Sequence, residues 1–137
     1  AGTARLIAEA PRGFEVYSGD DGLTLPLLAV GAVGVVSVAA HWVGLEIAEM
    51  ISSFLSGDVD AAARLNAELM DAVAFQSSDE APNPLPSKAI LRAMGFHVGE
   101  CRLPHGAAPA WLEERAEAVL ADLESWRAAR SAQPVGV

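Results

Sequence analysis

The sequence is poor in the residues that build disulfide bonds and metal sites. One cysteine, Cys101, excludes an internal disulfide and makes a reducing compartment, the cytoplasm, the expected location. The three scattered histidines, His41, His97 and His105, lack the spacing of zinc ligands. We therefore expect no metal ion and assign Cys101 no role.

Positive charge is also scarce. Nine lysines and arginines stand against 18 aspartates and glutamates, which gives a net charge of −9, and the basic residues form no cluster. A partner held through its phosphates, nucleic acid above all, is therefore not expected. The chain has 137 residues, of which 52% are apolar, enough for the buried core of one domain.

One long run, Gly22–Leu45, carries no acidic residue, lysine or arginine. About 20 apolar residues suffice to cross a bilayer, but Pro26, Gly31 and Gly34 interrupt this run. Its pattern also changes from LTLPLLAVG to the β-branched VGVVSVAA, which is typical of a buried strand. We expect no membrane span, and the first residues do not resemble a secretory signal.

Turn residues divide the first part of the chain into alternating helices and strands. The expected elements are a helix over Thr3–Ala10, the strand Phe14–Ser18, a helix over Leu23–Val30, the strand Val35–Ala39 and a helix over Leu45–Leu55 that Gly57 ends. Alternation with short loops predicts a parallel sheet in an α/β fold. Two such strands leave both sheet edges open, so the pattern indicates part of a larger sheet.

Only helices are expected in the second part of the chain. Apolar spacing and a proline-rich start predict three of them, over Asp60–Phe75, Lys88–Met94 and Trp111–Arg130, and a frayed tail follows.

The motif YSGDDG, residues 17–22, follows the first strand. In parallel α/β folds the chemistry is carried by the carboxyl ends of the strands, which together form a functional rim. Ser18, Gly19, Asp20 and Asp21 are therefore expected on that rim. Adjacent carboxylates also suit a helix start, whose free amides attract them. We favour capping for Asp21 and ligand contact for Asp20. A metal site is the least favoured interpretation, because no third ligand is evident.

Three segments in order carry a resemblance to a known family: YSGDDGLTLPLLAVGAVGVVSV, NPLPSKAILRAMGF and RLPHGAAP. They resemble the dihydrodipicolinate synthase and N-acetylneuraminate lyase family. The resemblance implies an α/β fold, the C-terminal portion of a (βα)8 TIM barrel followed by a three-helix extension. Residues 1–57 would be the last two βα units of the barrel, and residues 58–137 the extension.

The resemblance also implies an activity. Members of the family are Schiff-base aldolases, a class of lyase, and the named enzyme condenses pyruvate with aspartate semialdehyde in diaminopimelate and lysine biosynthesis. They need no cofactor and form homo-oligomers, here implied to be a tetramer. Relatives that cleave sialic acid or sugar acids share the architecture and remain open. A non-enzymatic remnant that assembles with a full-length relative is a further alternative.

The family's catalytic lysine ends the sixth strand of the barrel, which would lie before Ala1. The sole lysine here, Lys88, is expected to be a solvated surface charge, and the sole tyrosine, Tyr17, to pack in the core. No catalytic residue is therefore expected in this chain, which alone should be inactive.

Three substrate-binding residues carry over from the family. Val36 matches an isoleucine whose backbone helps to hold pyruvate, and a main-chain contact should survive the loss of one methylene. Gly19 and Asp20 match the loop beside the second substrate. Glycine permits close approach of a ligand to the backbone, and the aspartate can accept a hydrogen bond.

Overall fold

The computed structural model describes residues 2–132, which fall into two compact units. The first extends to Val73 and the second begins at Ala74. The division expected from the resemblance, between residues 57 and 58, separates barrel from extension and stays a prediction.

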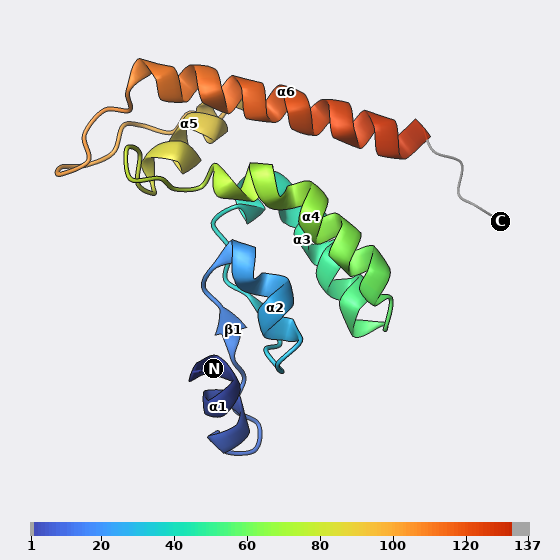
Figure 1. The fold of residues 1–137 in the computed structure, drawn as a ribbon. Helices are drawn as coiled ribbons and strands as arrows, with labels where there is room; N and C mark the ends of the chain where they lie inside the picture. The colour runs from blue at the N-terminus through green and yellow to red at the C-terminus, as the bar shows by residue number, and fades with distance from the viewer. Residues whose placement is uncertain (1, 133–137) are drawn as a thin grey trace. The chain divides into compact units, whose positions relative to one another are not determined.

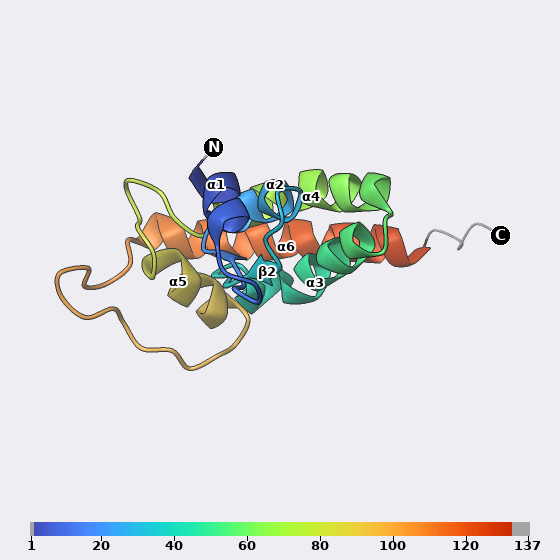
Figure 2. The same cartoon turned by 90° about the horizontal axis from the view of Figure 1, so that it is seen from below.

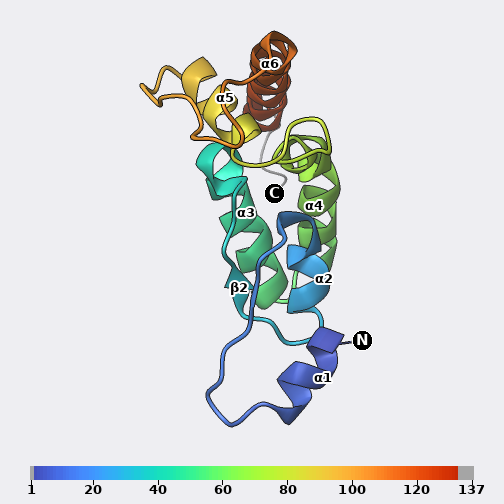
Figure 3. The ribbon, with the colours of Figure 1, turned by 90° about the vertical axis from the view of Figure 1, so that its left-hand side faces the viewer.

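A small parallel sheet lies in the first unit. Strand β1 (Tyr17–Ser18) pairs with β2 (Gly34–Val35), and Ser18 lies opposite Val35. The crossover between them contains the short 3₁₀ helix η1 (Asp21–Leu23) and helix α2 (Thr24–Leu28) (Figures 1 and 3). The predicted strand, helix, strand unit with parallel strands is confirmed.

Both strands are shorter than the predicted Phe14–Ser18 and Val35–Ala39. One more backbone hydrogen bond, from the Val36 amide to the Ser18 carbonyl at 2.8 Å, extends the ladder at its carboxyl end. After Val36 the chain leaves the sheet, because the amides that follow donate to an aspartate side chain. The predicted strand lengths were therefore wrong, whereas the predicted direction and order of the strands were right.

The remaining helices of this unit are α1 (Gly2–Glu9), α3 (Ala40–Leu55) and α4 (Val59–Ala74). Helices α3 and α4 run alongside each other in opposite directions (Figures 1 and 3). Gly57 joins them with φ +93°, the left-handed conformation predicted from the sequence. Asp58 then caps α4, because its Oδ1 accepts the Ala61 amide at 2.9 Å.

Helix α3 begins five residues before the predicted Leu45. Its first turn is set off by Val43, whose φ of −128° and ψ of 27° kink the helix. The regular part therefore starts close to the predicted position. The predicted frayed tail lies outside the described residues from 133 onward.

A hydrogen bond inside the core joins α3 to α4. The indole Nε1 of Trp42, which is buried, donates to the Ala72 carbonyl at 3.0 Å. Apolar side chains on both helices are buried as well: Val43, Ile47, Met50, Leu65, Leu69 and Val73. The kinked first turn of α3 is thus tied to the last turn of α4, and this fixes where the chain enters α3.

The second unit contains α5 (Leu85–Ala93) and α6 (Ala110–Ala132), which lie side by side (Figures 1 and 2). The buried residues of α6 recur every three or four positions, at Leu112, Ala116, Val119 and Leu123, which places one apolar face on this helix. Those of α5 are Leu85, Pro86, Ser87, Ala89 and Ile90. Within residues 2–132, no helix is both long enough and apolar enough to cross a membrane.

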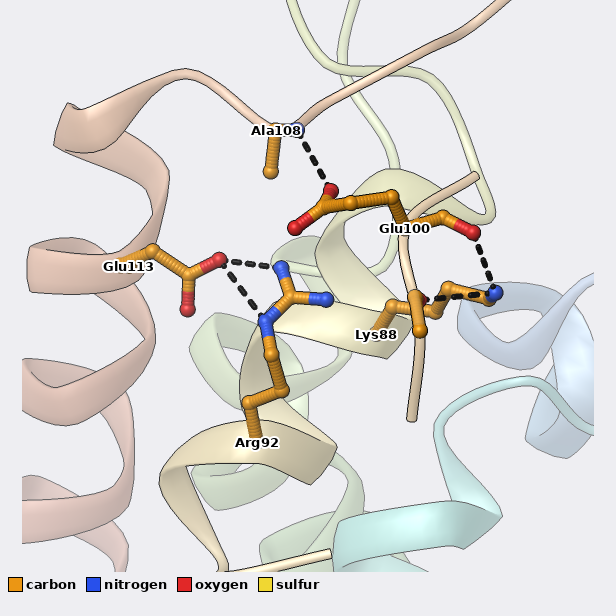
Figure 4. Close-up of polar contacts among 6 residues, drawn as sticks. Lys88, Arg92, Glu100, Ala108 and Glu113 are labelled. Atoms are coloured by element: carbon orange, nitrogen blue, oxygen red, sulfur yellow. Dashed lines mark hydrogen bonds and ion pairs between the residues drawn. The ribbon is translucent and has the colours of Figure 1, made fainter. Parts of the chain in front are cut away.

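Lys88, expected to be a solvated surface charge, is partly exposed and has hydrogen-bond partners within the chain. Its Nζ donates to the carbonyls of Gly99 and Glu100, both at 3.0 Å, and so holds the long loop between α5 and α6 (Figure 4). The Glu100 carboxylate accepts the Ala108 amide at 3.3 Å across the same loop. Both hydrogen bonds of Lys88 lie in an exposed setting, so the predicted surface position holds, and the added feature is that the charge has fixed partners in the loop.

A second polar contact joins α5 to α6 directly. The Arg92 guanidinium forms an ion pair with Glu113, in which Nε and Nη2 both donate to Oε1 (Figure 4). The hydrogen bond to Glu113 raises the pKa of Arg92 above its usual value. The Arg92 guanidinium therefore stays charged throughout the physiological range.

We expect Trp42→Phe to destabilise the protein by about 1–3 kcal/mol, because the buried Ala72 carbonyl loses its donor. Urea denaturation followed by far-UV circular dichroism measures the change. Trp111→Phe is the matched control, since Trp111 is 45% exposed. Equal losses in the two variants would show that the indole hydrogen bond contributes nothing.

Lys88→Met should free the loop between α5 and α6, because methionine fills the space of the stem but donates nothing to the two carbonyls. Loss of about 1 kcal/mol raises the open population roughly fivefold. Limited trypsin digestion should then cleave faster after Arg102, which lies in this loop. Arg64→Met, on the exposed side of α4, is the control, and equal cleavage rates would refute the assigned role.

Candidate functional site

The loop after β1 is a tight turn held by Ser18. The Ser18 hydroxyl donates to the Asp20 carbonyl at 2.6 Å, and the same oxygen accepts the Asp20 amide at 3.2 Å. Ser18 is buried, whereas Gly19 is exposed, and a methyl group at Gly19 would meet nothing within 4 Å. The turn thus presents its backbone at Gly19 to the surroundings.

Asp20 caps the short helix that follows. Its backbone is extended, and its Oδ1 accepts the Gly22 amide at 2.9 Å. Asp20 is exposed, so its carboxylate is accessible from outside the loop. Among the interpretations considered for this residue, capping is realised, and contact with a ligand stays a prediction.

The sequence suggested that Asp21 caps the helix after it, but it does not. Its carboxylate reaches across to the loop after β2, where it accepts the Ser37 hydroxyl, the Val38 amide at 3.0 Å and the Ala39 amide at 3.3 Å. Asp21 is only 5% exposed. The cap prediction was wrong because this carboxylate accepts hydrogen bonds from amides at the start of α3 instead. These amides lie 17 and 18 positions further along the chain.

Val36 stands at the carboxyl end of β2, and it is 72% exposed. Its amide donates to the Ser18 carbonyl, which leaves its own carbonyl oxygen as the main-chain group that a ligand can use. Gly19 and Val36 each follow one member of the paired residues Ser18 and Val35. The structure therefore brings Gly19, Asp20 and Val36 to the same end of the sheet, the one at which both strands end.

Tyr17 does not pack in the core, contrary to expectation. It is 49% exposed, and its hydroxyl donates to Glu15 at 2.7 Å. That hydrogen bond and the negative charge of Glu15 raise the pKa of Tyr17. The ring covers Gly34 on the neighbouring strand, where a methyl group would come within 3.2 Å of it. Tyr17 therefore stays protonated and shields the sheet.

Of the two serines of this site, the sequence analysis placed Ser18 at the strand end without a structural role and missed Ser37. Ser18 shapes the first loop, and Ser37 joins Asp21 to the start of α3, where its oxygen accepts the Ala40 amide at 2.8 Å. The one available signal was position, because each serine interrupts an apolar run at the end of a strand.

The arrangement can bind and orient polar groups through carbonyl, amide and carboxylate groups. It has no amine, since the sole lysine belongs to the second unit and donates to two carbonyls. In the part of the chain that the structure describes, no three of the histidine, cysteine, aspartate and glutamate side chains gather to hold a metal ion. The chemistry that these loops offer is recognition of a small polar molecule.

Comparison with known proteins connects these features to a family. Residues 2–123 match the dihydrodipicolinate synthetase family. The 4-hydroxy-tetrahydrodipicolinate synthase of Thermosynechococcus vestitus is 48% identical over 118 residues, which are 86% of this chain and 39% of the relative. The enzyme of the same name from Listeria monocytogenes is 50% identical over 101 residues, 74% of this chain and 34% of the relative.

Solved structures agree with the sequence relatives. Dihydrodipicolinate synthase from Cyanidioschyzon merolae, crystallised with lysine bound, superposes with a TM-score of 0.80 at 39% identity over 89% of this chain and 41% of that one. The enzyme from Aquifex aeolicus gives a TM-score of 0.80 at 32% identity, with the same coverage. The chain thus spans about two fifths of each of these structures. It belongs to the dihydrodipicolinate synthetase family.

Proposed function

We propose that this chain forms the C-terminal part of a pyruvate-dependent aldolase that condenses pyruvate with aspartate semialdehyde. The observation that carries the proposal is the rim at which Gly19, Asp20 and Val36 meet, in a chain of this family. The two described strands would be the seventh and eighth of a (βα)8 barrel, and α4, α5 and α6 the helices of its extension.

The exposure of the small sheet supports this larger architecture. Parallel sheets are normally buried on both faces, yet Val36 is 72% exposed, and Tyr17 and Val33 are exposed as well. Further strands and helices of a closed barrel would cover these side chains. We extend the same resemblance to the assembly and propose a homotetramer for the complete enzyme.

Each residue of the rim takes a defined part in the proposed reaction. A lysine on another strand of the barrel would form a Schiff base with pyruvate, with the loss of one water molecule. The carbonyl oxygen of Val36 would accept a hydrogen bond from the N–H of the protonated Schiff base, because pyruvate itself has no donor. Gly19 would let the second substrate approach the backbone, and the exposed carboxylate of Asp20 would accept hydrogen bonds that orient that substrate.

A chimaeric enzyme tests the proposed function. In it, this chain replaces the matching part of the Thermosynechococcus vestitus relative, which supplies the rest of the barrel. We expect the chimaera to condense pyruvate with aspartate semialdehyde and to be labelled covalently when pyruvate is trapped with borohydride. Sialic acid or a sugar acid as the preferred substrate would favour the related lyases instead.

The 137-residue chain alone should not be labelled by pyruvate and borohydride. Its one amine side chain, Lys88, is partly exposed and donates to two backbone carbonyls, whereas a Schiff-base lysine needs a free amine in an active site. Mass spectrometry after trapping detects the adduct. Labelling at Lys88 would contradict the assignment of the nucleophile to another part of the enzyme.

Asp20→Ala in the chimaera should impair the handling of aspartate semialdehyde more than the binding of pyruvate. Loss of one oriented hydrogen bond costs about 1–3 kcal/mol, or roughly 10- to 100-fold in kcat/KM for the second substrate. Steady-state kinetics with each substrate varied in turn measures the effect. Unchanged kinetics with a lowered melting temperature would mean that Asp20 serves only as a helix cap.

A further inference from the structure

The two loops of the rim are far apart in sequence but fixed to each other by one side chain. Gly19 and Asp20 lie in the loop after β1, and Val36 begins the loop after β2. We propose that Asp21 is a positioning residue, whose buried carboxylate sets the separation between these two substrate contacts. The inference rests on the proposed function and adds a residue to which that function assigned no part.

The geometry of the carboxylate supports this role. Both of its oxygens are used: Oδ1 accepts the Ser37 hydroxyl, and Oδ2 accepts the amides of Val38 and Ala39 at 3.0 and 3.3 Å. Hydrogen bonds to a charged acceptor are roughly twice as strong as neutral ones, and burial strengthens them further. Asp21 therefore holds three consecutive residues of the second loop in one place.

The attachment points adjoin the proposed substrate contacts. Asp21 follows Asp20 directly, and Ser37 follows Val36 directly. A displacement at either end of the link moves the neighbouring substrate contact through a single peptide bond, which is planar and stiff. The link thus acts on both contacts, although Asp21 is itself buried.

Ser37 extends the link to helix α3. Its hydroxyl donates to Asp21, and its oxygen accepts the Ala40 amide at 2.8 Å. Ser18 has the corresponding place in the first loop, where it holds both main-chain groups of Asp20. Each loop is therefore braced by its own serine, and Asp21 joins the two.

The proposed reaction makes the separation of the contacts important. Formation of a carbon–carbon bond requires the reacting atoms of two substrates to lie about 3–3.5 Å apart, and a displacement of about 1 Å can cost roughly a hundredfold in rate. Pyruvate would be held from the Val36 side and the aldehyde from the Gly19 side. Loosening the link should therefore lower kcat more than it raises either KM.

Ser37 offers the mildest way to test the link. Ser37→Ala removes one donor to Asp21 and leaves both amides in place, while Ser37→Thr retains the hydroxyl and serves as the control. Asp21→Asn, which keeps the shape of the side chain and removes its charge, is the stronger variant.

Hydrogen exchange on the 137-residue chain tests the coupling independently of any activity. In Ser37→Ala we expect amide exchange to accelerate by about tenfold, both at Val38 and Ala39 and across residues 19–22 of the other loop. Ser37→Thr should exchange like the unsubstituted chain. Acceleration confined to residues 37–40 would overturn the proposal, because the loops would then move independently.

Kinetics of the chimaera test the positioning role. For Ser37→Ala we expect kcat to fall about 10- to 100-fold, with each KM within about threefold of its original value, and Ser37→Thr to restore kcat. A lowered melting temperature with unchanged kcat would overturn the proposal and leave Asp21 a structural residue. If the unsubstituted chimaera lacks activity, the proposed function fails, and hydrogen exchange alone decides the coupling.

Discussion

The buried carboxylate of Asp21 holds together the part of the chain on which the candidate site depends. A two-stranded parallel sheet with only two paired residues in each strand is a weak support for a binding site. The carboxylate compensates, because it joins the loop after one strand to the helix start after the other with three hydrogen bonds. Asp21 also accepts hydrogen bonds from two amides at the start of α3, which would otherwise lack partners at a partly buried position.

The same helix start is fixed from its other side by Trp42. The indole hydrogen bond to Ala72 ties the first turn of α3 to the last turn of α4, and the kink at Val43 separates this turn from the regular helix. The position of residues 37–40 is thus set by a carboxylate on one side and by an aromatic side chain on the other. The polar contacts of Asp21 and the buried contact of Trp42 therefore both act on the start of α3.

Much of the architecture could be predicted from local sequence signals. Apolar periodicity, the left-handed Gly57 and the proline-rich segment before α5 act over a few residues, so they gave the order of elements and most helix boundaries to within two residues. The starts of α3 and α5 lie five and three residues before the predicted Leu45 and Lys88. Gly19 and Asp20 were likewise placed correctly after the first strand, whereas Val36, predicted to lie inside the strand Val35–Ala39, follows the shorter β2. Strand length was not predictable, because it depends on which amides other groups take up.

What the sequence could not reveal were partners at a distance along the chain. Nothing local distinguishes two adjacent aspartates, one of which bonds two residues ahead and the other 16 to 18 residues ahead. Lys88 likewise meets carbonyls 11 and 12 residues away. Both carboxylates of the motif accept hydrogen bonds from backbone amides, but Asp20 is exposed and Asp21 is buried. Burial, which follows from the fold, therefore separates the carboxylate that a ligand could reach from the carboxylate that only fixes the backbone.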